Sequence, residues 1–357
     1  MQTLPVAQKT DYTADINAVL DTFFKTNRAE AALVSPYYRD LWNEVERLLV
    51  SGGKRLRPKT LILAYRMMGG KDVAAILPAA AAQEFIHLGM LIHDDIIDRD
   101  YIRYGVDNVA GSYDKIYSMM VTDKADRLHY AQSAAILAGD LMLSSAYLLM
   151  AESSIDPQRI LQAQRLFGRG IFEVIGGEFI DTESAFRALG DVKSETVAFY
   201  KTASYTFVAP MLIGAVLADA TIEQQAHLRS FAENLGVAFQ LRDDIIGVFG
   251  DEELTGKSTS GDIREGKRTY MVEQFYELAD GEDRAVFDRY FGNHAISNEE
   301  VETVRGLLVN SGAKQKTLDT IDDYEIKARA ALSHIHIDQS TIDELETVIT
   351  ISTKRDK

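Results

Sequence analysis

Asp94, Asp95 and Asp98 follow the apolar part of the stretch FIHLGMLIHDDIIDRDYIRYG, residues 85–105. Asp94 and Asp98 are four residues apart, so they share one face of a helix, and Asp95 lies beside them. Carboxylates crowded at the end of an apolar helix repel one another and oppose its dipole, so a fold tolerates them when a cation is bound. Oxygen ligands on one face suit Mg²⁺, which is held by one or two carboxylates plus substrate phosphates. A solvated acidic helix end is the alternative, and the aliphatic neighbours argue against it.

A second acidic stretch, QLRDDIIGVFGD at residues 240–251, repeats this arrangement. Asp243, Gly247 and Asp251 follow one another at four-residue steps, and Asp244 is adjacent to the first. Two aliphatic helices that end in paired aspartates would form a cup of carboxylates if they faced each other, and such a cup could hold several Mg²⁺ ions. Either motif alone is weak evidence, but the two together, with basic motifs around them, are specific.

Basic residues accompany both acidic clusters. The segment GGKRLRP, residues 52–58, places three cations in four positions between flexible glycines and an apolar helix. The free N–H groups and the dipole of a helix start add to such side chains, so the segment predicts an anion site. A solvated basic turn is the alternative, which the acidic balance of the chain disfavours. The other cations near the clusters are Arg103, Lys201, Lys257, Arg264, Lys267 and Arg268.

A diphosphate can be bound on one side by metal ions and on the other by basic side chains. The carboxylates of these motifs would hold the metal ions, and the cations would contact the phosphate oxygens. The other residues near these motifs are apolar, so the rest of the lining should be apolar too. The pattern therefore predicts a substrate with a diphosphate head and a hydrocarbon tail.

The elements that must position these residues read as helices. Apolar residues recur at helical spacing over 16–24, 41–49, 61–68, 76–92, 131–150, 157–179, 195–218, 236–249, 297–310 and 318–332. The pattern over 131–150 is apolar on most faces and predicts a buried helix. Residues 105–130 are polar and irregular, which predicts a loop or an insertion. The long helix over 195–218 should be interrupted near Lys201-Thr202 and near Pro210.

Local signals mark where several helices begin. Thr221 with Gln224, and Ser297 with Glu300, form capping boxes, and Asp156 precedes Pro157 as a helix cap. No strand pattern is longer than a few residues. We expect one all-α domain over residues 1–357, with a loose lead-in at 1–15 and a motif-bearing core at 45–275.

Composition sets the outer limits of the interpretation. The chain has 357 residues, is 46% hydrophobic, carries a formal net charge of −16 and contains no cysteine. The charge argues against a nucleic-acid partner. The lack of cysteine excludes disulfides and thiolate metal sites and fits a reducing compartment. The N-terminus lacks the basic and apolar regions of a signal peptide, and no uncharged apolar run is long enough to span a bilayer. We expect a cytoplasmic protein without stable membrane insertion.

Seven motifs together resemble those of the trans-type isoprenyl diphosphate synthases. In chain order they are GGKRLRP, HDDIIDRDYIRYG, the Gly139-Asp140 pair, GGEFID, YKTAS, FQLRDDIIGVFGD and GKSTSGDIREGKRT. Their form is most similar to that of prokaryotic geranylgeranyl and other polyprenyl diphosphate synthases. The resemblance implies the all-α isoprenoid synthase fold, a helical bundle around a deep central cavity, and a homodimer.

The resemblance also implies a reaction. A prenyltransferase of this kind condenses isopentenyl diphosphate head-to-tail with an allylic prenyl diphosphate, by Mg²⁺-dependent ionisation, condensation and elimination, with three Mg²⁺ ions per active site. Cations stabilise the charge that develops on the leaving diphosphate, and a closed pocket keeps water away from the carbocation. No side chain is clearly placed to take the final proton. In the family the released diphosphate is thought to take it.

The family's roles fall on matching residues of this sequence. The isopentenyl diphosphate site would comprise Lys54, Arg57 and His87, with Tyr104 at a further contact position. The allylic diphosphate site would comprise Arg103, Lys201, Lys257 and Lys267. The Mg²⁺ ligands would be Asp94, Asp98 and Asp243, supported by Asp95, Asp244 and Asp251. Thr202 and Gln240 would direct their oxygens at the allylic cation. A core histidine remains the alternative for His87, and a helix-capping amide the alternative for Gln240.

Two positions depart from the family's pattern. The first acidic motif usually closes with Arg-Arg-Gly, whereas here it closes Arg103-Tyr104-Gly105. A tyrosine hydroxyl can donate a hydrogen bond but carries no charge, so weaker binding of isopentenyl diphosphate or a compensating cation is expected. The second motif has Gly247 where an aspartate is common, and Asp251, one turn further, is the candidate to substitute as an indirect ligand.

The helix before the first acidic cluster should also set product length. Short-chain relatives often place an aromatic floor four or five residues before the motif, where this chain has Gly89 and Met90. Gly89 should leave the floor open, and Met90 is flexible enough to move. On the neighbouring helix Ser144 is small, while Tyr147 could stop growth deeper. We expect a product of C20 or longer, shortened by Gly89→Phe.

Three other readings compete with a synthase. A terpene cyclase or a head-to-head condensing enzyme would share the fold and the acidic motifs, but cyclases normally lack GGKRLRP and the paired second site. A non-catalytic subunit of a heteromeric synthase is favoured by Tyr104 and Gly247. A purely structural helical bundle would make the whole motif set a coincidence.

Overall fold

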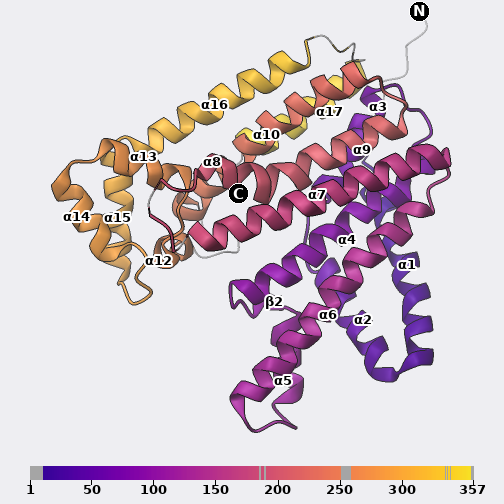
Figure 1. Ribbon diagram of the computed structural model, residues 1–357, viewed down its shortest axis with the longest axis horizontal. Helices are drawn as coiled ribbons and strands as arrows, with labels where there is room; N and C mark the ends of the chain where they lie inside the picture. Colours follow the sequence, from indigo (N-terminus) through magenta and orange to yellow (C-terminus); the bar gives the residue numbers. More distant parts are fainter. Residues whose placement is uncertain are drawn as a thin grey trace, which may run out of the picture. The chain divides into compact units, whose positions relative to one another are not determined.

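The computed structural model describes residues 11–184, 186–188, 190–250, 259–333, 335, 337 and 339–354 (Figure 1). These residues are almost entirely helical, which confirms the all-α class. The described strands are β1 (Ile102–Arg103) and β2 (Val106–Asp107), which form one short antiparallel pair. The chain divides into two compact units, residues 1–164 and 165–357. The single domain expected from the sequence stays a prediction.

The first unit is built around two long helices that pack against each other, α4 (Val73–Ile97) and α6 (Lys124–Ala151). The other helices of this unit are α1 (Thr13–Val34), α2 (Pro36–Val50), α3 (Leu56–Met67) and α5 (Val109–Tyr117). Aromatic rings join α1, α2 and α4. Phe23 lies 5.0 Å from Phe85, and Phe24 meets Trp42 edge-on at 5.7 Å between ring centroids.

Glycines allow α4 and α6 to approach closely. A Cβ atom on Gly89 of α4 would lie 3.1 Å from the Gly139 carbonyl oxygen and 3.2 Å from Leu143 Cδ2, both on α6. A Cβ atom on Gly139 would fall on the ring of His93, only 2.1 Å from Nε2. Gly89 therefore faces the backbone and a leucine of the neighbouring helix, and its role as an open floor for the product stays a prediction.

Two expectations for the first unit need correction. Residues 105–130 are not a loop, because they contain β2, α5 and the first turns of α6. Their polar residues lie on exposed helix faces and in turns. The helical spacing of the apolar residues is therefore hard to recognise in the sequence. The helix over 131–150 is not buried on most faces, since Leu137 and Leu148 of α6 are 61% and 62% exposed.

The helices α4 and α6 are each long and apolar enough to cross a membrane by length and composition alone. Within the protein, 72% of the most apolar window of α4 is buried, against 44% of that of α6. A buried core helix has this composition without any membrane, which accounts for α4.

The second unit holds the rest of α7 (Pro157–Ser184), which begins near the end of the first unit. Its other elements are α8 (Ser194–Val197), the π-helix η1 (Ala198–Val208), α9 (Ala209–Leu217), α10 (Ile222–Phe249), α12 (Gly261–Glu265), α13 (Tyr270–Leu278), α14 (Gly281–Tyr290), α15 (Asn298–Asn310), α16 (Ala313–Ala331) and α17 (Gln339–Thr353). The helix α10 packs against η1, α16 and α17. Stacked Phe275 and Phe287 rings, 4.2 Å apart, anchor α13 to α14.

Helix starts in this unit follow the local signals of the sequence. The capping boxes Thr221–Gln224 and Ser297–Glu300 are both formed, which confirms them. The helix expected over 195–218 begins at Ser194. Its expected interruption near Lys201-Thr202 takes the form of eleven π-helical residues, Ala198–Val208, and a new α-helix begins beside Pro210. π-Helical segments are rare and are frequently found at functional sites.

Candidate active site

The basic segment GGKRLRP of the first unit divides its cations between two roles. Arg55 turns inward and is 8% exposed. It donates to the buried Glu84 at 2.9 Å and to the Leu49 carbonyl at 3.2 Å. Lys54 is exposed and Arg57 is half-buried. Arg55 is therefore a structural residue that ties the segment to α2 and α4, and the two flanking cations remain the candidates for anion binding.

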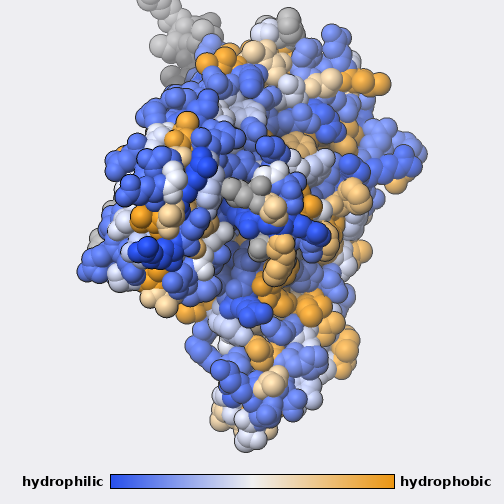
Figure 2. Space-filling view, turned by 60° about the vertical axis from the view of Figure 1, so that its left-hand side comes forward, coloured by the Kyte–Doolittle hydropathy of each residue, from blue (hydrophilic) through white to orange (hydrophobic). Residues whose placement is uncertain are grey.

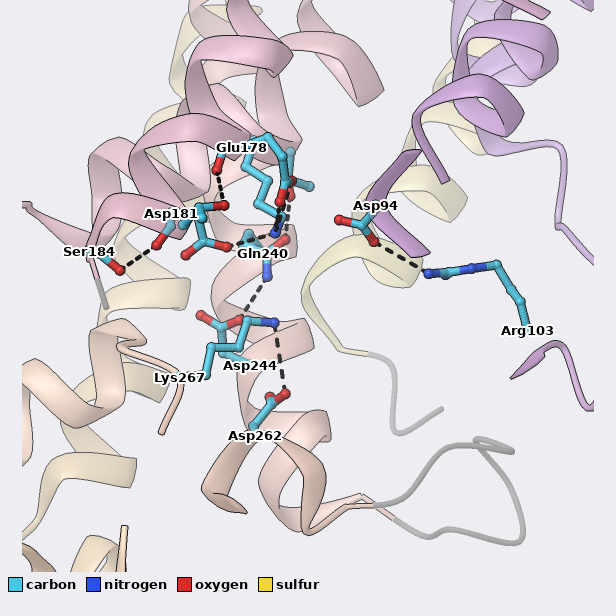
Figure 3. A network of polar contacts seen from close by, with 12 residues as sticks. Asp94, Arg103, Glu178, Asp181, Ser184, Gln240, Asp244, Asp262 and Lys267 are labelled. Atoms are coloured by element: carbon cyan, nitrogen blue, oxygen red, sulfur yellow. Dashed lines mark hydrogen bonds and ion pairs between the residues drawn. The ribbon is translucent and has the colours of Figure 1, made fainter. Parts of the chain in front are cut away.

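Arg103 of the first unit is bound by the first acidic cluster. Its Nε donates to Asp95 Oδ1 at 2.6 Å. A terminal nitrogen donates to Asp94 Oδ2 at 3.3 Å (Figure 3). Asp95 is 2% exposed, and burial raises its pKa to about 6 although Arg103 opposes the rise. Asp95 therefore serves to hold Arg103, whereas Asp94 is half-buried and Asp98 is exposed.

Tyr104 packs against the basic segment rather than replacing an arginine's charge. A Cβ atom on Gly52 would fall 2.6 Å from the Tyr104 ring, so the ring covers this glycine. The tyrosine has a left-handed backbone, with φ +55°, and its side chain remains 43% exposed. His87 is half-buried on α4. Tyr104 thus lies beside the segment that carries Lys54 and Arg57.

Lys201 of η1 is held by two acidic residues of α7 that the sequence analysis had not assigned to the site. Its Nζ lies 2.7 Å from Asp181 and 3.0 Å from Glu178, both from the GGEFID motif (Figure 3). Gly177 makes this contact possible, because a Cβ atom there would lie 2.2 Å from the Lys201 backbone nitrogen. The GGEFID motif contains both acids, so it was the signal in the sequence from which they could have been assigned to the site.

A cavity in the second unit gathers residues from α7, η1, α10 and the segment before α13. Its lining comprises Asp181, Ser194, Val197, Ala198, Lys201, Thr202, Gln240, Asp243, Asp244, Ile246, Gly247, Thr259, Asp262, Lys267, Arg268 and Thr269. Five of the predicted site residues are therefore brought together with Lys267: Lys201, Thr202, Gln240, Asp243 and Asp244.

A chain of hydrogen bonds crosses this cavity. The Thr202 hydroxyl donates to Gln240 Oε1 at 2.5 Å, and the Gln240 amide nitrogen donates to Asp244 Oδ1 at 2.7 Å. In this structure the Gln240 oxygen accepts the threonine hydroxyl, and its role toward a substrate cation stays a prediction. A helix-capping role does not hold, since both partners are side chains.

Burial and a nearby positive charge have opposite effects on the pKa of Asp244 in the second acidic cluster. Asp244 is 6% exposed, and burial raises its pKa to about 7, against the opposing influence of Lys267. The Lys267 ammonium lies 3.8 Å from Asp262, whose charge raises the lysine's pKa. A divalent cation near Asp244 would favour its ionised form. Asp262 lies against Gly247 and is a further acid that the sequence analysis had not assigned.

Two predicted residues, Asp251 and Lys257, lie outside the described residues. Among the described residues, no three His, Cys, Asp or Glu side chains converge on a ready-made metal cage. Mg²⁺ does not need one, because it keeps several waters and takes one or two carboxylates plus substrate phosphates. Asp94 and Asp98 of the first unit, and Asp243 of the second, each carry a carboxylate of the type that Mg²⁺ prefers.

Comparison with known proteins agrees with the motifs and the helical architecture. A family model described as Polyprenyl synthetase matches residues 39–308. Geranylgeranyl diphosphate synthase of Sulfolobus acidocaldarius is 34% identical over 266 residues, covering 73% of this chain and 74% of that protein. Geranylfarnesyl diphosphate synthase of Aeropyrum pernix is 33% identical over 298 residues, covering 81% and 85%.

A solved structure is also similar over nearly the whole chain. Geranylgeranyl pyrophosphate synthase from Corynebacterium glutamicum, complexed with isoprenyl diphosphate and magnesium, superposes with a TM-score of 0.88 at 28% identity, covering 96% of this chain and 98% of that one. The fold is therefore the isoprenoid synthase fold. The chain belongs to the polyprenyl synthetase family and is a prenyltransferase.

Proposed function

We propose that this prenyltransferase condenses isopentenyl diphosphate head-to-tail with an allylic prenyl diphosphate and releases a product of C20 or longer. The cavity of the second unit carries this proposal, because it combines Asp243 and Asp244 with Lys201 and Lys267. The geranylgeranyl and geranylfarnesyl synthases among the relatives support a product of this length.

The proposed roles follow from charge and position. Lys201, Lys267 and Arg103 bind the allylic diphosphate and stabilise the charge that it gains on leaving. Lys54 and Arg57 hold isopentenyl diphosphate beside Tyr104, and His87 completes that site. From their positions in the sequence, Lys257 is proposed for the allylic diphosphate site and Asp251 as a supporting Mg²⁺ ligand.

Mg²⁺ is the proposed cofactor, with three ions per active site. Asp94, Asp98 and Asp243 would hold them, and Asp244 would support them. The bound metal would supply Lewis acidity toward the leaving diphosphate. The solved relative complexed with magnesium and the all-carboxylate donor set support this choice.

We also propose a homodimer in the cytoplasm, in which residues 1–357 form one domain. The family model runs across the boundary between the two units, which supports one domain. Orange hydrophobic atoms interrupt the hydrophilic surface in Figure 2. Exposed apolar residues on α6 and α7, such as Leu137, Phe172 and Phe179, would suit a second copy. Sedimentation of Leu137→Glu against the unchanged protein tests this, because a dimer that uses the exposed face of α6 should dissociate.

Product analysis tests the reaction. The protein is incubated with Mg²⁺, isopentenyl diphosphate and dimethylallyl, geranyl or farnesyl diphosphate, and the products are identified by mass spectrometry. Prenyl diphosphates of C20 or longer are expected. Cyclised hydrocarbon would instead indicate a cyclase. No product from any starter, in a folded protein, would indicate a non-catalytic subunit.

Aspartate variants test the site within the same assay. Asp94→Ala and Asp243→Ala should each lower turnover by about 100-fold or more, because charge stabilisation at the leaving group is lost. The helical circular dichroism signal should persist. Asp322→Ala, an exposed aspartate on α16, is the matched control. Near-normal turnover in either site variant would overturn the metal assignment.

A further inference from the structure

The start of α8 is capped by a residue from a distant helix. The residue before it, Lys193, makes no side-chain cap to the helix. Instead both carboxylate oxygens of Glu273 on α13 are used. Oε1 accepts the Ser194 backbone N–H at 2.8 Å, and Oε2 accepts the Ser194 hydroxyl at 2.8 Å. Ser194 is buried and lines the cavity.

This cap lies at the entrance to the segment that carries the cavity's central residues. The four residues of α8 lead directly into η1, which contains Lys201 and Thr202. A second anchor follows at the next position, where the Tyr324 hydroxyl of α16 donates to Glu195 at 2.6 Å. The chain therefore enters η1 under restraint from α13 and from α16.

The body of η1 is packed tightly by glycines on both neighbouring helices. A Cβ atom on Gly177 of α7 would lie 2.2 Å from the Lys201 nitrogen, and one on Gly236 of α10 would lie 2.4 Å from the Ala203 Cβ atom. Lys201 and Thr202 themselves contact α7 and α10 through their side chains. The hydrogen bonds at Ser194 and Glu195 add a restraint on rotation and sliding at the start of the segment.

We propose that Glu273 is a positioning residue, which sets the register of η1 and so places Lys201 and Thr202 in the cavity. It does not touch the reacting groups. The inference rests on the proposed roles of these two residues in allylic diphosphate binding. A displacement of about 1 Å at a reacting group can lower a rate about 100-fold, so a cap far from the chemistry can control turnover.

The test compares variants of Glu273 by steady-state kinetics with Mg²⁺, geranyl diphosphate and isopentenyl diphosphate. Glu273→Ala removes both acceptors and should lower kcat about 10- to 100-fold. Its KM for isopentenyl diphosphate should stay unchanged, because Lys54 and Arg57 belong to another segment. Glu273→Gln keeps an oxygen acceptor for the N–H and should restore most of kcat. Glu277→Ala, an exposed glutamate one turn further on α13, is the matched control and should behave as the unchanged protein.

Either of two results would overturn the proposal: Glu273→Ala with normal kcat, or Glu273→Gln as impaired as Glu273→Ala. If Glu273→Ala fails to fold, Ser194→Ala removes the hydroxyl bond alone, and a normal kcat in that variant would also count against the proposal. Lys201→Ala distinguishes a failure of the proposed role of Lys201 from a failure of the positioning role of Glu273. Normal turnover there would refute the proposed role of Lys201, whereas a loss there together with a normal Glu273→Ala would refute only the positioning role.

Discussion

The carboxylate of Asp262 occupies the space beside Gly247 that any larger residue would need. A Cβ atom on Gly247 would lie 2.2 Å from Asp262 Oδ2, and the same carboxylate lies 3.8 Å from the Lys267 ammonium. The glycine in the second acidic motif is therefore matched to an acid that arrives from α12. The motif is one aspartate short on α10, while the cavity lining still contains Asp262 in addition to Asp181, Asp243 and Asp244.

Restoring the common motif should consequently damage the enzyme. Gly247→Asp forces the new side chain into Asp262, and we expect turnover to fall at least about 10-fold, since charge stabilisation at this site depends on fixed geometry. Combining it with Asp262→Gly should recover part of the loss. Turnover at several Mg²⁺ concentrations provides the measurement.

A second glycine supplies the control for that prediction. Gly176 on α7 has no atom within 4 Å of an added Cβ, so Gly176→Ala should leave turnover unchanged. Alanine is favoured over glycine inside helices by about 1 kcal/mol. A Gly247→Ala variant with normal turnover would show that the close contact with Asp262 has no functional weight.

The buried pair of Arg55 and Glu84 should be costly to break on one side. Glu84→Ala leaves the guanidinium buried without its 2.9 Å partner, and we expect the free energy of unfolding to fall by about 3–5 kcal/mol. Urea unfolding followed by circular dichroism measures this. The exposed pair Arg187–Glu183 is the control, because Glu183→Ala should cost only about 0.5 kcal/mol. Equal losses in the two variants would contradict the structural role of Arg55.

Enlarging Gly89 should strain the contact between α4 and α6. We expect Gly89→Phe to lower the free energy of unfolding by about 1–3 kcal/mol, because the ring overpacks against Leu143. Adding Leu143→Ala makes room on one side and should recover part of this loss, since the contact with the Gly139 carbonyl remains. In both variants we expect shorter products by mass spectrometry. Unchanged product length in the double variant would mean that the growing chain does not run past residue 89.

The attachment of α17 should weaken in acid. Hydrogen bonds from Thr353, at 2.7 Å, and from Arg329, at 3.0 Å, outweigh burial and hold the pKa of Glu325 below its ordinary 4.5. Because the folded-state pKa is the lower one, the stabilisation is complete above pH 4.5 and is lost as the pH falls further. Glu325→Gln should therefore be less stable than the unchanged protein at pH 6, and the difference should shrink below pH 4.5.

Thermal unfolding across this pH range measures the effect. Asp322→Asn, an exposed change on the same helix, serves as the control and should show no such convergence. A difference between Glu325→Gln and the unchanged protein that stays constant from pH 6 to pH 3.5 would refute the assignment.

The helical fold and the residue types of the site could be predicted from the sequence, because both depend on local spacing. The pairing of charges could not. Arg55 has the same sequence neighbourhood as Lys54 and Arg57, and only the three-dimensional position of Glu84 makes it a structural residue. Likewise Gln240 meets Thr202 across 38 residues, so the direction of its amide was not readable from the motif.

Other misses have a similar physical origin. Asp262 and Glu178 reach the cavity region from elements whose approach is set by glycines, and a glycine in a sequence does not say what fills the space beside it. The helices at 105–130 were missed because exposed polar faces weaken the apolar period on which the prediction relied.

The π-helical form of η1 has a consequence for how this chain can change in length. Each turn of η1 contains more residues than an α-helical turn, so the segment holds surplus chain without a bulge or a loop. In a regular α-helix, loss of one residue rotates the side chains before it by about 100° relative to those after it. In η1 a change from i→i+5 to i→i+4 hydrogen bonding can take up a lost residue instead. A single deletion in η1 should therefore disturb the flanking helices less than one in α10, although it would shift Lys201 and Thr202.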